Sequence, residues 1–132
     1  MGQRRLLLVL CCMAFLRSAV VYSQSESGPG VAVRIENATD KVFESVVIGF
    51  PSQREDYGSI PAGEASVYRS VARAYRYAYA EIKIDGETLV LRPIDYVGES
   101  LLRPGRYTYR ITLNPKSTSR DNRIFLDLVV DK

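Results

Sequence analysis

Hydrophobic and polar residues alternate strictly along residues 106–113 of the chain. The apolar residues on one side of this segment are Tyr107, Tyr109, Ile111 and Leu113. A period of two is typical of a β-strand that buries one face only. The Pro-Gly pair at 104–105 predicts a sharp turn just before the strand. Such a strand requires a second apolar layer to cover it, so other segments must supply that layer.

Other segments of the chain, most of them before residue 106, show similar alternation and are separated by turn residues. They predict strands at residues 31–36, 42–50, 64–71, 75–84, 87–92, 106–113 and 123–131, with a short extended piece at 57–60. The Asp-Gly pair at 85–86 favours a two-residue hairpin turn. No segment shows a convincing helical period. The pattern therefore predicts an all-β domain, an antiparallel β-sandwich of about seven strands.

The same alternation predicts which residues form the core. On the first and last strands, the residues expected inward are Val31, Val33, Ile35, Ile124, Leu126, Leu128 and Val130. Within residues 42–50, one face carries Val46, Ile48 and Phe50, and the other carries Phe43 and Val47. Both faces of that strand are therefore expected to be partly covered. The polar residues 51–58 are expected to form a loop.

The N-terminus has the composition of a secretory signal peptide. Arg4 and Arg5 precede an apolar run at 6–16, and more polar residues follow. The run is too short to span a bilayer, which takes about 20 residues. We expect cleavage after Ser23, which gives a signal peptide at 1–23, a flexible linker at 24–30 and a β-sandwich domain at 31–132. The mature protein would be secreted or periplasmic, with no transmembrane segment.

Cys11 and Cys12 leave a second interpretation of the N-terminus open. They are the only cysteines in the chain, and a lipoprotein signal would anchor the protein to a membrane through one of them. However, Leu10 stands where lipidation normally requires a small residue, and both cysteines lie inside the apolar run. We therefore prefer to interpret them as apolar filler of the signal peptide. The mature domain would then contain no disulfide.

The balance of charge argues against two classes of partner. The chain contains 18 Lys and Arg and 15 Asp and Glu, but loss of residues 1–23 would remove Arg4, Arg5 and Arg17. The mature domain would then be formally neutral, with 15 residues of each sign. A neutral domain gives no electrostatic reason to bind nucleic acid or an anionic membrane surface.

The absence of histidine removes most catalytic chemistry. Histidine is the usual general base and transition-metal ligand, and serine–histidine or cysteine–histidine catalysis requires it. The close acidic pairs in loops are Glu55 with Asp56 and Asp95 with Glu99. Solvated loop charges are the simpler interpretation of both. A calcium site needs six or more oxygen ligands, so Asp95, Glu99 and Asp121 would have to converge. We predict no enzyme activity, no metal site and no cofactor.

Residues 105–109 resemble the tyrosine corner of immunoglobulin-like and fibronectin type III sandwiches. The resemblance gives Tyr107 the role of the corner tyrosine, whose hydroxyl bonds back to the upstream backbone, with Gly105 as the small residue before it. Tyr109 stands where an antibody domain has a cysteine, and the chain has no tryptophan, which excludes an antibody-type domain.

The turn at 102–107 also resembles the last strands of transthyretin-like and carboxypeptidase-regulatory-like domains. The chain as a whole resembles small exported bacterial proteins of unknown function. These resemblances imply an immunoglobulin-like or transthyretin-like β-sandwich and no particular chemistry.

One stretch, residues 75–84, stands out as a candidate binding feature. In a strand, its core face would carry Ala78, Ala80, Ile82 and Ile84, and its outer face Tyr75, Tyr77 and Tyr79. Outward tyrosines combine apolar area with a polar tip, which suits ligand or partner surfaces. Arg73 and Arg76 beside them could donate hydrogen bonds to a glycan or peptide. The competing interpretation is that a bulge near Arg76, or a covering loop, removes some tyrosines from the surface.

These features predict a non-catalytic binding module for a protein or glycan partner, which acts through the tyrosine row. The alternative is an accessory or assembly subunit of an envelope complex, in which the same face is buried against another protein. A hydrolase that uses carboxylates is the least supported of the three.

Overall fold

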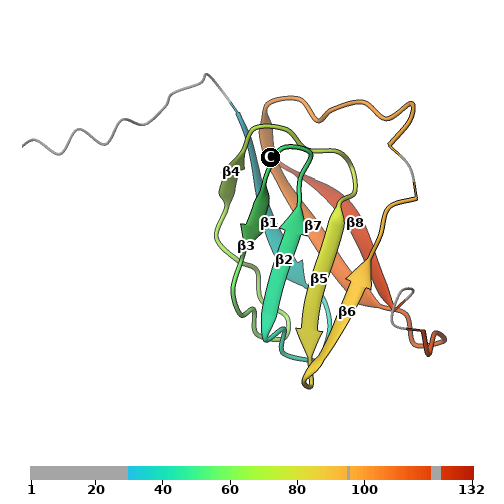
Figure 1. The fold of residues 1–132 in the computed structure, drawn as a ribbon. Coiled ribbons are helices and arrows are strands. Elements are labelled where there is room, and N and C mark those ends of the chain that lie inside the picture. The colour runs from blue at the N-terminus through green and yellow to red at the C-terminus, as the bar shows by residue number, and fades with distance from the viewer. Residues whose placement is uncertain (1–29, 95, 120–122) are drawn as a thin grey trace, which may run out of the picture.

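The described part of the chain forms eight β-strands in two sheets of four strands each (Figure 1). The computed structural model describes residues 30–94, 96–119 and 123–132, and this part of the chain contains no helix. The strands are β1 (Val31–Asn37), β2 (Ser45–Gly49), β3 (Arg54–Asp56), β4 (Arg69–Val71), β5 (Tyr79–Ile84), β6 (Glu87–Leu91), β7 (Gly105–Leu113) and β8 (Ile124–Asp131). One sheet has the order β4-β1-β7-β8 and the other β3-β2-β5-β6. The all-β prediction is confirmed.

The predicted strand count and the uniformly antiparallel order are both wrong. β3 lies within residues 51–58, which were expected to be a loop, and pairs with β2 as a three-residue edge strand. β1 and β7 run parallel, in a register that places Val31 opposite Gly105. Parallel strands need a long connection, and here β2 to β6 all lie between the two partners. A pairing between segments so distant in sequence leaves no local pattern.

Several strands are shorter than their alternation suggests. The chain bends at Glu44 between β2 and an isolated bridge that pairs Phe43 with Ile60. Because of this bend, Phe43 lies in the same core as Val46, although strict alternation places the two on opposite faces. Of the strand predicted at 64–71, only β4 forms. The predicted hairpin turn is confirmed: Asp85 and Gly86 have positive φ angles of 50° and 76°.

The core lies between the two sheets and is built from the faces that the alternation predicted. Its fully buried members on the long strands include Val33, Ile35, Val46, Ile48, Ala80, Ile82, Tyr109 and Ile111. Burial of one such large apolar side chain stabilises the fold by about 1.5–3 kcal/mol. A domain of about 100 residues can therefore be stable through these contacts alone.

β8 departs from the predicted core pattern at its end. Val130 pairs with Tyr107 on the inward side of the strand, yet 65% of its surface is exposed. β8 is an edge strand, and the opposite sheet ends in β6, which stops below the upper part of β8 (Figure 1). The inward side of this part of β8 is therefore uncovered. The prediction that Val130 is a core residue is wrong.

The predictions for the N-terminus fall on residues 1–29, apart from Gly30 at the end of the expected linker. The signal peptide, its cleavage site and both cysteines therefore lie outside the described residues. In the part of the chain that the structure covers, no helix is long and apolar enough to cross a membrane.

Candidate functional site

Two connecting segments cover the upper end of the domain, where β1 and β7 begin and β8 ends (Figure 1). Residues 72–78 connect β4 to β5, and residues 92–104 connect β6 to β7. The backbone N–H of Leu102 donates a hydrogen bond of 2.8 Å to the carbonyl of Ala74, which joins the two segments. These segments carry most of the residues that the sequence marked as a candidate binding site.

A stack of tyrosines joins the same two segments. The ring of Tyr96 stacks on Tyr75 at a centroid distance of 4.8 Å and on Tyr77 at 5.4 Å. All three residues are half-buried, and burial raises the pKa of the Tyr96 hydroxyl above its usual value. Aromatic pairs of this kind contribute about 0.5–1.5 kcal/mol beyond the area that they bury. The stack therefore fixes residues 92–104 against residues 72–78.

The predicted tyrosine row is thus divided. β5 begins only at Tyr79, so Tyr75 and Tyr77 precede the strand and are covered by Tyr96. Tyr79 itself lies over Gly49, where an added Cβ would come within 3.2 Å of the Tyr79 Cβ. The expectation of a continuous row in one strand is wrong, and a covering loop, the competing interpretation, is what the structure contains.

Tyr79 belongs to a separate polar cluster on β5. Its hydroxyl donates a 2.5 Å hydrogen bond to Glu81, which raises the pKa of Tyr79 above its usual value. The Arg54 guanidinium lies 5.3 Å from the centre of the Tyr79 ring and 3.2 Å from the Glu81 carboxylate. This arrangement already satisfies the Tyr79 hydroxyl, so we do not include Tyr79 in the candidate site.

Two tyrosines of β7 brace the upper end from within the domain. The hydroxyl of Tyr109, which is fully buried, donates a 2.5 Å hydrogen bond to the carbonyl of Tyr75. The hydroxyl of Tyr107 donates a 2.6 Å hydrogen bond to the carbonyl of Arg103. The structure thus contains the backbone contact that the tyrosine-corner resemblance implied for Tyr107. One strand therefore anchors both segments through alternate residues.

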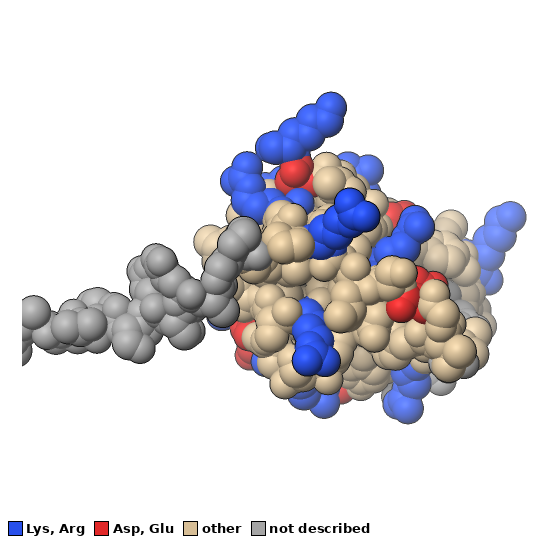
Figure 2. Space-filling model, turned by 90° about the horizontal axis from the view of Figure 1, so that it is seen from above, with Lys and Arg blue, Asp and Glu red and all other residues tan. Residues whose placement is uncertain are grey.

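The two segments contain four arginines, all of them exposed: Arg73, Arg76, Arg92 and Arg103. Within the described residues, none of the four makes an ion pair, whereas Arg34, Arg54, Arg69, Arg110 and Arg123 all do. Arg73 and Arg103 are each one residue from the hydrogen bond between Ala74 and Leu102. Figure 2, which looks onto this end, shows more Lys and Arg than Asp and Glu. We call these four arginines with Tyr75, Tyr77 and Tyr96 the arginine–tyrosine surface.

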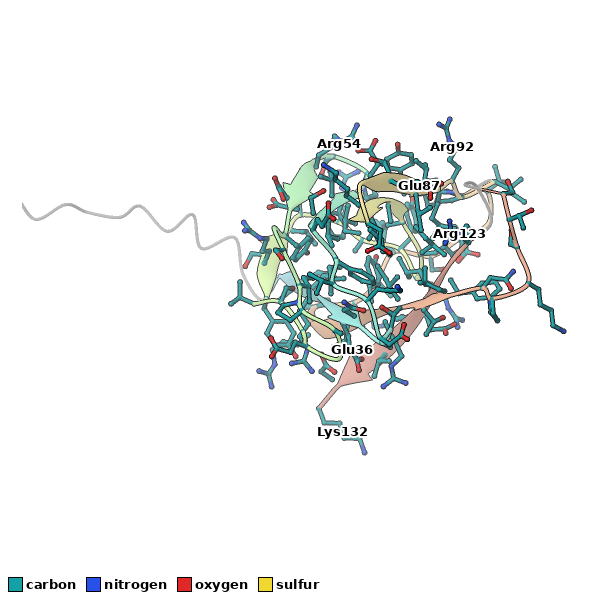
Figure 3. The ribbon with its side chains drawn as sticks, turned by 90° about the horizontal axis from the view of Figure 1, so that it is seen from below. Glu36, Arg54, Glu87, Arg92, Arg123 and Lys132 are labelled. Atoms are coloured by element: carbon teal, nitrogen blue, oxygen red, sulfur yellow. The ribbon has the colours of Figure 1, made fainter. Side chains whose placement is uncertain are left out.

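An apolar groove adjoins this surface on the side of the domain where β6 and β8 end their sheets. The groove has a volume of about 440 Å³ and is lined by Tyr77, Leu91, Arg92, Pro93, Ile94, Ile124, Phe125 and Leu126. Ile94 is fully exposed and Phe125 is 51% exposed. Arg92 points away from the domain, while nearby Arg123 pairs with Glu87 at 3.3 Å (Figure 3). We call this feature the β6–β8 groove.

Of the acidic residues weighed for catalysis or calcium, two have other roles and two lie outside the described residues. Glu55 accepts a hydrogen bond from Gln53 and pairs with Arg69, while Asp56 accepts the N–H of Gly58. Asp95 and Asp121 are not described. In the described part of the chain, no three acidic, histidine or cysteine residues come close enough to hold a metal ion.

The lower end of the domain contains a polar cluster centred on Asn37. Its buried side-chain amide donates hydrogen bonds to the carbonyls of Lys41, Ile60 and Pro61 at 2.7–3.2 Å. Its side-chain oxygen accepts hydrogen bonds from the backbone and hydroxyl of Thr39. Asn37 and Thr39 have the spacing of a glycosylation acceptor, but the amide nitrogen is fully engaged in the fold. This cluster is structural.

Sequence reasoning missed Tyr96, Arg92, Arg103 and the whole β6–β8 groove. One local signal was present: residues 92–104 contain Ile94, Val97 and Leu101, which are apolar residues in a segment with no strand pattern. All three are exposed. Apolar side chains in an exposed loop are candidates for an interface.

No protein-family model and no curated protein matches the sequence. A solved structure with a similar fold is the NMR structure of a protein from Eubacterium rectale, with a TM-score of 0.52. The two sequences are 11% identical, and the match covers 78% of this chain and 92% of that chain. At this identity the similarity shows a shared fold and nothing about function.

Proposed function

We propose that the mature domain is a non-catalytic binding module that holds a protein or glycan partner on the arginine–tyrosine surface. The observation that carries the proposal is the group of four exposed arginines, which form no ion pair with any described residue, in the same two segments as the tyrosine stack. Guanidinium groups bind carboxylates and other planar anions with two parallel hydrogen bonds. Arginine and tyrosine are also the residues enriched where proteins bind partners.

The bracing by β7 supports the same proposal. A binding surface costs less entropy to use when its residues are already held in place. Tyr109 and Tyr107 anchor the two segments at Tyr75 and Arg103, next to the arginines that would contact the partner. The segments are therefore positioned before any partner binds.

We further propose that the domain is exported, either to the periplasm or out of the cell, and has an immunoglobulin-like or transthyretin-like sandwich fold. Export rests on the signal-peptide pattern of residues 1–23. Intact-mass measurement of the exported protein tests it, and a mature form that begins at Gln24 is expected. A mass that retains residues 1–23, or a lipid on Cys11 or Cys12, would contradict it.

A second candidate function is that of an accessory or assembly subunit, whose upper end is permanently buried against a larger protein. The observation that favours it is the exposure of Ile94, Val97 and Leu101 in residues 92–104. Exposed aliphatic residues are typical of surfaces that another protein covers. A stable complex that survives purification would support this function, and reversible binding would support the first.

Binding to a glycan array and to a random peptide library displayed on phage tests the proposed function. The arginine variant Arg76→Glu/Arg103→Glu is compared with Lys116→Glu, which places one reversed charge on an exposed residue of the connection between β7 and β8, at the opposite end of the domain. We expect any selected ligand to bind the wild type and Lys116→Glu alike, and to bind the double variant about tenfold more weakly or worse. Equal binding to all three proteins would overturn the proposal.

A further inference from the structure

The open side of the domain lies between the last strands of the two sheets. β6 ends one sheet and β8 ends the other, and the two are not paired with each other. Across the described residues, no strand pairs with the outer edge of β8. Its sequence over Ile124–Asp131 contains no Lys, Arg or Pro, residues that often protect an exposed edge, and its charged residues are Asp127 and Asp131. Six of the eight residues are apolar, and the unpaired edge can receive another strand.

The β6–β8 groove lies beside this edge and is chemically asymmetric. Apolar side chains form most of its lining, and Arg92 is the one charged residue in that lining. Arg92 forms no ion pair with any described residue. The other lining residues offer no carboxylate to Arg92. A ligand that fills the groove would gain from apolar side chains and from one carboxylate placed at Arg92.

These features favour a polypeptide over a glycan. Sugars bind to proteins mainly by stacking on exposed aromatic faces and by hydrogen bonding, and here Tyr75, Tyr77 and Tyr96 stack on one another. The groove is lined instead by Ile94, Leu91 and Phe125, which suit the side chains of an extended peptide. The adjacent β8 edge can bond the backbone of a strand but has no equivalent use for a sugar ring.

They also argue against a second copy of the domain as the occupant. Asp127 lies near the middle of β8. Antiparallel pairing of two β8 strands centred on Asp127 would place the two Asp127 side chains opposite each other, and like charges in a cross-strand pair are unfavourable.

We infer that the β6–β8 groove and the β8 edge bind an extended segment of a partner protein that carries apolar residues and at least one carboxylate. The segment adds to β8 as a strand, places apolar side chains against Phe125 and Ile94, and pairs its carboxylate with Arg92. This inference rests on the proposed function and specifies its partner and its main point of attachment.

Selection from a random peptide library displayed on phage, with the folded domain as target, tests the inference. We expect the selected peptides to be rich in aliphatic residues and in Asp or Glu. A synthetic selected peptide is then titrated into the wild type and into Arg92→Glu and Phe125→Ser. Both altered residues are exposed, so both variants should fold, and a urea melt checks this.

Two matched variants serve as controls. Val42→Ser alters an apolar residue that is 52% exposed, against 51% for Phe125, and Lys116→Glu reverses a charge away from the groove. We expect affinity to fall about tenfold or more in Arg92→Glu and Phe125→Ser and to stay unchanged in both controls. The selected peptide is also made with Asp and Glu replaced by Asn and Gln. This neutral peptide should bind the wild-type domain about as weakly as the selected peptide binds Arg92→Glu.

Other outcomes would overturn the inference. No enriched peptide, enriched peptides without carboxylates, or equal binding to Phe125→Ser would each contradict it. Glycan binding that these peptides do not compete with would assign the surface to a sugar instead, and a concentration-dependent dimer abolished by Phe125→Ser would assign the groove to a second copy. If binding depends on Arg76 and Arg103 but not on Phe125, the inference fails while the proposed function stands.

Discussion

The buried hydroxyl of Tyr109 donates a hydrogen bond of 2.5 Å to the backbone carbonyl of Tyr75. This contact joins the centre of the core to the surface that we propose binds a partner. Two residues earlier on β7, Tyr107 bonds the carbonyl of Arg103 in the other segment of that surface. The alternation that makes β7 a one-sided strand therefore also determines which residues hold the binding surface in place.

Tyr109→Phe should destabilise the domain by about 1–3 kcal/mol, because it leaves the Tyr75 carbonyl without its donor in a place where water has little access. Urea unfolding measures the loss. Tyr79→Phe is the matched control, since the Tyr79 hydroxyl bonds the half-exposed Glu81, and should change the free energy of unfolding by less than about 0.5 kcal/mol. An unchanged midpoint in Tyr109→Phe would show that the bracing contact contributes nothing.

Tyr107→Phe tests the corner itself. We expect a loss at the lower end of the same range of about 1–3 kcal/mol, because Arg103 is exposed and water can replace some of its hydrogen bond with Tyr107. Amide hydrogen exchange should also speed up at Leu102, the residue before Arg103 in the segment. If the free energy of unfolding and the exchange rate are both unaltered, the Tyr107 hydrogen bond does not stabilise the domain as a tyrosine corner would.

Asp131 should make stability depend on pH in the acid range. Burial alone would raise the pKa of its carboxyl, but hydrogen bonds from Thr108 and Tyr68, with the charges of Arg34 and Arg106, outweigh burial and lower that pKa below its usual value of 3.8. A carboxyl whose pKa is lower when folded stabilises the protein above its unfolded pKa. That contribution is lost as pH falls below about 4.

Urea midpoints of the wild type and Asp131→Asn between pH 2 and pH 6 measure this contribution. The variant should be less stable at neutral pH and should lose less stability than the wild type on acidification. Parallel curves for the two proteins would mean that the carboxyl of Asp131 does not have the lowered pKa.

The double variant Tyr77→Ser/Tyr79→Ser separates the two interpretations of the tyrosine row. If both side chains were bare surface residues, as the sequence suggests, the cost would be less than about 1 kcal/mol. Because Tyr77 stacks on Tyr96 and Tyr79 packs over Gly49, we expect about 2 kcal/mol in urea melts. Complete loss of folding would instead show that the pair belongs to the core.

Local signals in the sequence predicted local features of the fold. The alternation of 106–113 gave the buried face of β7, the Asp-Gly pair gave the β5–β6 turn, and the spacing of Gly105 and Tyr107 gave the corner. Each of these depends on residues a few positions apart. The parallel pairing of β1 with β7 and the exposure of Val130 depend on where distant strands end, which no short pattern encodes.

The candidate site divides in the same way. The sequence predicted that four residues of the site lie close together because all of them fall within five positions: Tyr75, Tyr77, Arg73 and Arg76. It could not add Tyr96 or Arg103, because the approach of residues 92–104 is set by tertiary contacts such as the Tyr107 hydrogen bond. Tyr79 was wrongly grouped with them because the strand was assumed to begin four residues before it does.

Mapping of backbone amide shifts by NMR tests the central claim most directly. The ¹⁵N-labelled mature domain is titrated with a peptide chosen by library selection, and shift changes are assigned residue by residue. The account predicts that the largest changes fall in residues 72–78, in residues 92–104 and at the start of β8. Changes confined to the lower end around Asn37, or spread evenly over the domain, would contradict the assignment of the arginine–tyrosine surface as the binding site.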